Sequence, residues 1–332
     1  MKKLIIILTA VFLLDVQCYS QTGWQVLNSG VTVNLYGLWF PNVSTGYVCG
    51  ANGTILKTTN GGLNWNPLNT SVSYQLNDIC FTDNVTGYCA GNSGIIKTTN
   101  FGMNWFSVFN LQMNKICYAE NIIFAGGQNG IYKSLDSGQT WTNILQSSEG
   151  TINGLFFNNS NTGYGMGGNG LQRKTTNGGL NWLGGAYWGP YTYYFGECHF
   201  FNSDTGFVGY SYNSGSPYYY VGYGIYKATY WNTGGSSWLQ VYNSSTKGIG
   251  GLTFTGRDTG YAVGGGWTGS QYESLILKTI NGGNNWVQQN FVINQILQDV
   301  FFLDSKKGYA VGRTGTILKT ETGGVVGIEN IS

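Results

Sequence analysis

Hydrophobic residues recur along this chain in short segments separated by Gly, Asn, Ser and Thr. The segments are rich in β-branched and aromatic side chains, and no window keeps the spacing of an amphipathic helix. Four segments make a unit that returns roughly every 40 residues, the repeat length of a propeller blade. The pattern predicts an all-β chain built from blades of four antiparallel strands, which is a β-propeller.

The first segment of each unit has the form apolar-x-x-apolar-x-aromatic. The second follows a turn such as Thr45-Gly46-Tyr47, the third reads Gly-x-Ile-x-Lys-Thr, and the fourth starts at a repeated Trp. Because the first segment aligns in seven units, we expect seven blades. Its copies are residues 35–40, 76–81, 113–118, 152–157, 195–200, 249–254 and 297–302.

The connection between the third and fourth segments is the most repeated stretch, and its first copy runs from Lys57 to Trp65. In this copy Asn60 is predicted to cap a turn with its side chain, and Gly61 or Gly62 to take positive φ. Trp65 is predicted to fill the space between blades. Other copies are 97–105, 133–141, 174–182 and 278–286, with an enlarged copy at 227–238 and a truncated one at 319–324.

The two ends of the repeat complete each other. The seventh unit stops at Gly324 without its Trp segment, whereas Trp24 opens a fourth segment that lacks the rest of its unit. We therefore expect the N-terminal strand to complete the last blade and close the ring, which leaves no free sheet edge at the seam.

The stretch Ser134-Leu135-Asp136-Ser137-Gly138-Gln139-Thr140-Trp141 matches the Asp-box of sialidase-like repeats. Together with the Thr-Gly-Tyr and Asn-Gly-Gly-x-x-Trp series, it resembles the seven-bladed propellers of the photosystem II assembly and stability factor family. This resemblance implies a protein-binding scaffold. Photosynthetic members have a basic, arginine-containing surface, whereas this chain has only Arg173, Arg257 and Arg313, in unrelated places. The same repeat occurs in sialidases, xyloglucan hydrolases and sortilin-type receptors.

Both ends of the chain carry export features. Lys2 and Lys3 precede an apolar run over residues 4–14 and a Cys18-Tyr19-Ser20 site, which predicts a signal peptide over 1–20. The propeller would then span 21–324. The tail, 325–332, resembles the linker before a type IX secretion sorting domain. We expect an exported protein at the cell surface, in the periplasm or outside the cell.

Composition narrows the choice of partners. Charged residues are 9% of the chain and the net charge is +2, which offers no electrostatic footprint for nucleic acid or an anionic membrane. The mature chain has no apolar run long enough for an integral membrane segment, and we expect a monomer. The cysteines of the mature chain lie in strand-like runs and suggest small buried side chains, with disulfides as the alternative.

Catalytic chemistry is scarce in this sequence. The only histidine, His199, occupies a strand position and is expected to pack, and no spacing suits a metal or a cofactor. A sialidase would need an arginine cluster. The one acidic constellation is Asp78, Glu197 and Asp299, each third in a first segment, which we expect to form a ring at one mouth of the channel. The expectation is a non-enzymatic protein, with a glycoside hydrolase using this ring as the less favoured alternative.

Large insertions in the fifth and sixth units are expected to place long loops on one face. They are rich in Tyr and Trp with Gly, Ser and Asn, a composition typical of surfaces that bind proteins or glycans. The hypothesis is a protein-binding scaffold, with a glycan-binding module as the alternative. The candidate ligand-binding residues here are Tyr187, Trp188, Tyr191, Tyr193, Tyr212, Tyr219, Trp267 and Tyr272.

Overall fold

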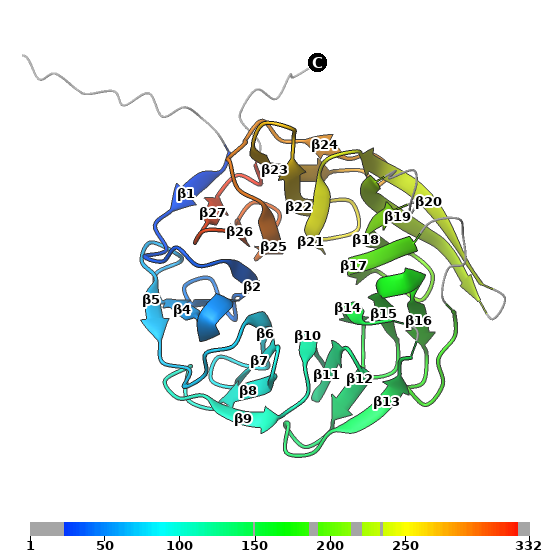
Figure 1. The fold of residues 1–332 in the computed structure, drawn as a ribbon, viewed down its shortest axis with the longest axis horizontal. Coiled ribbons are helices and arrows are strands. Elements are labelled where there is room, and N and C mark those ends of the chain that lie inside the picture. Colours follow the sequence, from blue (N-terminus) through cyan, green and yellow to red (C-terminus); the bar gives the residue numbers. More distant parts are fainter. Residues whose placement is uncertain (1–22, 149, 186–191, 214–220, 233–234, 325–332) are drawn as a thin grey trace, which may run out of the picture.

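The computed structural model describes residues 23–148, 150–185, 192–213, 221–232 and 235–324. The expected signal peptide and the C-terminal tail lie outside these ranges. Seven antiparallel sheets surround a central axis (Figure 1), which confirms the seven-bladed propeller. No helix within the described ranges has the length and apolar character needed to cross a membrane.

The first strand of each sheet lies nearest the axis (Figure 1). From blade 1 to blade 7 these strands are β2 (Leu35–Trp39), β6 (Leu76–Phe81), β10 (Met113–Ala119), β14 (Ile152–Phe157), β17 (Thr192–Phe200), β21 (Gly248–Phe254) and β25 (Leu297–Phe302). The second strands are β3 (Gly46–Gly50), β7 (Gly87–Gly91), β11 (Ile122–Gly127), β15 (Gly163–Gly167), β18 (Gly206–Asn213), β22 (Gly260–Trp267) and β26 (Gly308–Gly312).

The third strands are β4 (Ile55–Thr58), β8 (Gly94–Thr98), β12 (Gly130–Ser134), β16 (Gln172–Thr175), β19 (Val221–Asn232), β23 (Tyr272–Thr279) and β27 (Ile317–Thr320). The outer strands are β5 (Asn66–Leu68), β9 (Phe106–Phe109), β13 (Thr142–Gln146), β20 (Gly235–Ser244), β24 (Val287–Gln288) and β1 (Gln25–Leu27). Blade 4 has three strands, and its outer segment contributes only a bridge from Leu183 to Lys174. Short 3-10 turns, η1 (Ala51–Gly53) and η2 (Gly168–Gly170), join strands in blades 1 and 4.

The N-terminal strand closes the ring, as predicted. β1 pairs antiparallel with β27, with Val26 opposite Leu318, and the sheet order is β1-β27-β26-β25. Trp24, directly before β1, is only 1% exposed and meets the ring of Phe302 edge-on at 5.9 Å. Figure 1 shows β1 (blue) beside β27 (red).

A register shift occurs in every inner strand, just after its first apolar residue. In blade 2, for example, it falls between Leu76 and Asp78. A regular strand would turn its first and fourth residues to opposite faces, and one extra residue brings both to the same side. The shift therefore explains the apolar-x-x-apolar spacing, because Leu76 and Ile79 are both buried in the core between blades 1 and 2.

Adjacent blades are joined by a repeated aromatic contact. The ring of Tyr47 in blade 1 stacks on Phe81 of blade 2 at 4.0 Å, and its hydroxyl donates to the Phe101 carbonyl at 2.9 Å. Lys57 donates to the same carbonyl at 2.8 Å. Tyr88 with Lys97, and Tyr261 with Lys278, repeat this arrangement. In these three blades the repeated Tyr and Lys tie the blade to the turn of the next, whereas blades 3 and 5 have Phe124 and Phe207 at the Tyr position.

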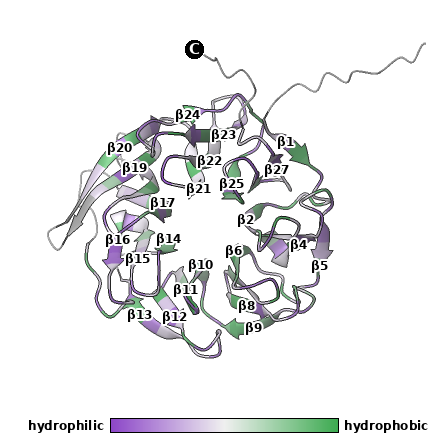
Figure 2. Cartoon of the chain, turned by 180° about the vertical axis from the view of Figure 1, so that it is seen from behind, coloured by the Kyte–Doolittle hydropathy of each residue, from purple (hydrophilic) through white to green (hydrophobic). Residues whose placement is uncertain are grey.

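The repeated turn has the predicted geometry. Asn60 Oδ1 accepts the Asn64 N–H at 3.0 Å, Gly61 and Gly62 have φ of 64° and 84°, and Trp65 is 7% exposed in the core between blades 7 and 1. This turn stabilises the fold. Both faces of a blade pack against its neighbours, so second strands such as β3 and β7 are buried along their whole length. Figure 2 shows hydrophobic and hydrophilic residues distributed all around the ring.

Two other packing predictions are confirmed. His199 lies between the rings of Phe156 and Phe254, at 4.8 and 5.4 Å, and burial lowers its pKa to about 4. All five described cysteines are free thiols, and four are buried, with Cys117 half-buried. The disulfide alternative is therefore wrong for this structure.

Blade 5 departs from the expected loops. Residues 192–194, 210–213 and 221–223 extend its strands rather than forming loops, and the enlarged copy at 227–238 continues the β19–β20 ladder, with Trp231 opposite Ser236. Alternating Tyr residues support this longer ladder. The β19–β20 hairpin projects outward from the ring (Figure 1).

Candidate functional site

The two faces of the disc differ in their turns. One face, the box face, carries the turns between first and second strands and the repeated turns such as 58–65. The opposite face, the loop face, carries the second-to-third and fourth-to-first connections, including 51–53 and 69–73. This division follows from antiparallel strand order and places three candidate features on or below the loop face.

The first feature is a cluster of charged side chains near the axis. Lys115 of blade 3 forms an ion pair with Glu197 of blade 5, and both side chains are less than one-fifth exposed (17% and 16%). Asp78 and Asp299 interact electrostatically with this pair. The predicted convergence of Asp78, Glu197 and Asp299 is therefore correct, but the cluster contains a lysine and is not a purely acidic ring.

The two aspartates connect adjacent blades. Asp78 Oδ2 accepts the Ile116 N–H of blade 3 at 2.9 Å, and Asp299 Oδ2 accepts the Leu38 N–H of blade 1 at 3.0 Å. Their other oxygens accept the N–H of the next residue in the chain. Where this strand position holds Gly, as at Gly154 and Gly251, an added Cβ would lie 1.9 Å from the Gly196 carbonyl oxygen and 2.7 Å from Asp299 Cα of the next blade. The position therefore faces the neighbouring inner strand.

Burial controls the ionisation of this cluster. It raises the pKa of Asp78 to about 6 and that of Asp299 to about 8, while Lys115 opposes both shifts. Burial alone would lower the pKa of Lys115, but the negative charges of Glu197 and Asp78 outweigh it and hold this pKa above its usual range. The cluster can hold a proton and an ion pair. Among the described residues, no three His, Cys, Asp or Glu side chains are arranged to hold a metal ion.

The second feature is the tip of the β22–β23 hairpin in blade 6. Trp267 and Tyr272 are 53% and 44% exposed, and their rings meet edge-on at 5.2 Å. The guanidinium of Arg313, from blade 7, lies 5.4 Å from the centre of the Tyr272 ring. Lys247 pairs with Glu273 at 2.9 Å just below the tip. The result is an exposed aromatic surface, held by a ladder and a cation–π contact.

The other aromatic candidates are placed differently. Tyr193 and Tyr212 pack on each other at 5.5 Å and join the core of blade 5 with Phe195 and Tyr210, so these two support the blade. They pack because β17 and β18 extend through this region as paired strands. Tyr187, Trp188, Tyr191 and Tyr219 lie outside the described residues.

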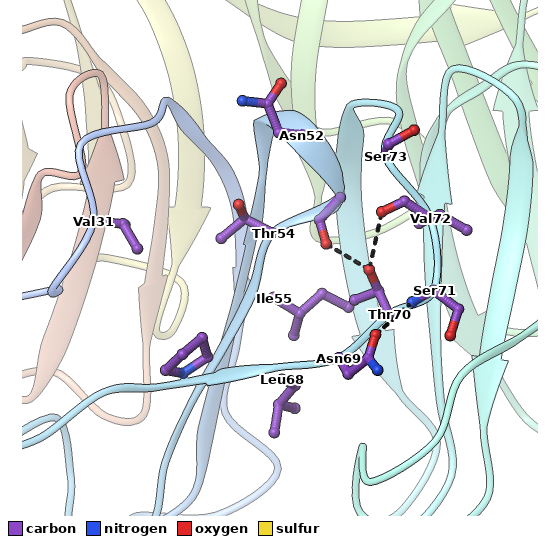
Figure 3. A pocket seen from close by; sticks show the side chains of 12 residues that line it. Val31, Asn52, Thr54, Ile55, Leu68, Asn69, Thr70, Ser71, Val72 and Ser73 are labelled. Atoms are coloured by element: carbon purple, nitrogen blue, oxygen red, sulfur yellow. Dashed lines mark hydrogen bonds between the residues drawn. The ribbon is translucent and has the colours of Figure 1, made fainter.

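The third feature, which the sequence analysis missed, is a cavity of about 480 Å³ on the loop face of blade 1. It lies between Val31 on one side and the loop at 69–73 on the other, with Thr54 and Ile55 between them (Figure 3). The repeated turn sequence Asn28-Ser29-Gly30-Val31 and Asn69-Thr70-Ser71-Val72 was its only available signal.

Residues 16–115 match the family model described as photosynthesis system II assembly factor YCF48. A solved structure titled "YCF48 bound to D1 peptide" is 19% identical, with a TM-score of 0.69 over 90% of this chain and 97% of that one. The resemblance to the YCF48 family is confirmed. No curated protein matches the chain by sequence.

Other solved propellers are also similar to this chain. YCF48 from Cyanidioschyzon merolae is 16% identical, with a TM-score of 0.68 over 90% of this chain and 98% of that one. A GH74 enzyme from Niastella koreensis is 17% identical, with a TM-score of 0.66 over 90% of this chain and 53% of that one. At these identities the structural likeness shows the fold alone.

Proposed function

We propose that this chain is an exported, monomeric and non-enzymatic binding module that recognises a protein partner through the aromatic tip of blade 6. The observation that carries the proposal is the pair Trp267 and Tyr272, large rings exposed on the loop face at the end of a paired hairpin. Exposed aromatic side chains on a rigid support lose little conformational entropy on binding and are enriched at interface hot spots.

The matched family supports a protein as the partner. The similar YCF48 structure is described as bound to a D1 peptide, so a propeller of this kind has a peptide ligand. The present chain offers rings and a single guanidinium, that of Arg313, at its tip. Its partner segment is expected to contribute apolar side chains that fill the corner between the Trp267 and Tyr272 rings.

The hydrolase alternative receives less support from the cluster at the axis. A glycosidase requires one carboxyl group as acid and another as base or nucleophile, both facing the substrate. Here Asp78 and Asp299 each accept two backbone N–H groups, and Glu197 is paired with Lys115. The arrangement suits structural support. If the Asp78→Asn and Asp299→Asn variants turned over a glycan at an unchanged rate, the hydrolase alternative would be ruled out.

The experiment is site-directed crosslinking in the organism, with a photoreactive residue at Gln271 beside the tip. A specific partner crosslinked at this position should be identified, purified and titrated against the wild type and Trp267→Ala/Tyr272→Ala. The proposal expects about tenfold or greater loss of affinity. The matched control is Leu180→Ala/Ile280→Ala, which removes two apolar side chains, 80% and 73% exposed, from the box face. Equal losses in both variants would refute the assignment.

Export is tested separately. Deleting residues 1–20 should retain the protein in the cytoplasm, whereas the full chain should be recovered from the periplasm, the cell surface or the medium. The mature protein should sediment as a monomer. An identical distribution of the two chains between fractions would contradict the export proposal.

A further inference from the structure

The cavity on blade 1 has an unusual lining for a ligand site. None of its lining residues is ionisable, and Asn52, Thr54, Ser71 and Ser73 bring amide or hydroxyl groups to it. Among the described residues these four side chains hydrogen-bond to no protein group. Its volume, about 480 Å³, falls in the range typical of small-molecule sites. Val31, Leu68 and Val72 add apolar walls, and Asn69 and Thr70 are the other polar side chains of the lining.

The walls of the cavity are held in place. Thr70 Oγ1 donates to the Gly53 carbonyl at 2.7 Å, which fastens the loop at 69–73 to η1, and the Gly53 N–H donates to the Tyr74 carbonyl at 2.8 Å. Figure 3 marks the two hydrogen bonds that the Thr70 hydroxyl makes with backbone carbonyls. Since the lining loops are tied by hydrogen bonds, binding here would not require ordering them.

Ser71 has a conformation that its sequence does not favour. Its φ is 58°, and the equivalent position in the turn at 28–31 is Gly30, with φ of 74°. Both turns are otherwise alike, because the N–H of Ser71 and of Gly30 each donate at 3.0 Å to the Asn two residues earlier. A serine in the left-handed region costs free energy that glycine would avoid. The structure thus keeps a hydroxyl at the cavity where the backbone favours glycine.

We infer that this cavity binds a neutral carbohydrate, with the hydroxyls of one or two sugar residues paired to Asn52, Thr54, Ser71 and Ser73. Hydroxyl and amide groups act as both donors and acceptors, as sugar hydroxyls do, and the apolar walls suit the C–H faces of the ring. An anion or a cation would find no charge partner.

A peptide added as an extra strand is disfavoured at the same place. The outer strand of blade 1, β5, has Pro67 at its centre, and this residue also lines the cavity. Proline has no backbone N–H and is a common means of blocking strand addition at a sheet edge. The cavity therefore differs from the protein-binding tip of blade 6 in both place and chemistry.

The test uses the mature protein and three neutral probes, cellotetraose, xylotetraose and mannotetraose. Titration calorimetry at pH 5.5 and pH 8 measures the binding of each probe. The variant Asn52→Gly/Thr54→Val/Ser71→Gly removes one amide and two hydroxyls. Gly suits the positive φ of Asn52 and Ser71, and Val is close in shape to Thr, so folding should be retained. A matching melting temperature checks this. Trp267→Ala/Tyr272→Ala is the control.

The expected result is binding of at least one probe, with the same affinity at both pH values because no lining group titrates. The triple variant should lose about tenfold or more, and the control variant should bind like the wild type. Three results would overturn the inference. The first is that no probe binds at a concentration of about 10 mM, beyond the range of weak affinity. The others are full binding by the triple variant and loss of binding only in the control. The last would assign sugars to the tip and leave the cavity without a role.

Discussion

At the scale of single residues, the repeated turn depends on one side-chain oxygen. Asn60 Oδ1 accepts from the Thr58 hydroxyl at 2.9 Å and from the Asn64 N–H at 3.0 Å. In blade 3 the same two bonds go to Asp136 Oδ1, from the Ser134 hydroxyl at 2.8 Å and the Thr140 N–H at 2.9 Å. The turn requires an acceptor at this position, and either Asn or Asp supplies it.

Substitution of Asn60 should follow this requirement. Asn60→Ala removes the acceptor of two hydrogen bonds and should lower the free energy of unfolding by about 1–2 kcal/mol. Asn60→Asp should remain close to the wild type, because Asp136 already serves in blade 3. Chemical denaturation of the two variants measures the difference. A similar loss in both would show that the amide nitrogen, not the oxygen, holds the turn.

The carboxyl of Asp299 should make stability depend on pH. Burial raises its pKa to about 8, with Lys115 opposing and Glu197 and Asp78 adding to the shift. In an unfolded chain the pKa of an aspartate is about 3.9. Between these values the folded protein holds a proton that the unfolded chain has lost, so stability should fall as the pH rises from about 4 to 8.

Urea midpoints at pH 5 and pH 8 measure this effect. The decrease between them should be smaller in Asp299→Asn than in the wild type. Asp258→Asn, an exposed site on the box face, is the control and should keep the wild-type difference. An unchanged difference in Asp299→Asn would mean that another group binds the proton.

At the scale of the blade, the Gly of the Thr-Gly-Tyr turn is a packing position. A Cβ on Gly87 would lie 2.6 Å from the ring of Phe81, and one on Gly206 would lie 2.1 Å from Phe200. The aromatic residue that ends each inner segment therefore covers the glycine that begins the next strand. This pair recurs in six blades, and blade 3 lacks it because Ile123, opposite Tyr118, stands in place of the glycine.

Gly87→Ala should be destabilising for this reason. The added methyl group would force Phe81, which is 3% exposed, out of a packed site, at a cost of about 1–3 kcal/mol. The matched control is Gly256→Ala, where a Cβ would meet no atom within 4 Å. Thermal unfolding compares the two, and an equal effect would show that the loss comes from the backbone of glycine and not from the ring.

These elements show which features the sequence could predict. The blades, the turns and the closure follow from local patterns, because a period of two in strands and the φ preference of glycine act within a few residues. The ion pair between Lys115 and Glu197 joins blades 3 and 5 across the axis, and no local pattern encodes it. The cavity was missed for the same reason, since Val31 and Ser71 come from the connections before and after blade 1 and line one cavity only in the folded ring.

At the scale of the whole molecule, the ring has one seam, where hydrogen bonds replace a covalent connection. β1 is joined to blade 1 through the chain and to blade 7 by its pairing with β27. Trp24 fixes this pairing as Trp65 fixes β5: Trp24 meets Phe302 at 5.9 Å and 87°, and Trp65 meets Phe40 at 6.0 Å and 88°. The two tryptophans are equivalent in packing and differ in topology.

This difference can be measured with Trp24→Ala and Trp65→Ala. Each removes a large buried side chain and should lose about 3–5 kcal/mol locally. In Trp65→Ala, β5 stays attached at both ends, so the amides of β4 should keep most of their protection against hydrogen exchange. In Trp24→Ala, β1 should separate from blade 7 and leave the edge of β27 unpaired, so the amides of residues 317–320 should exchange much faster and the protein should self-associate. Equal exchange in β4 and β27 would mean that the seam is no weaker than the rest of the ring.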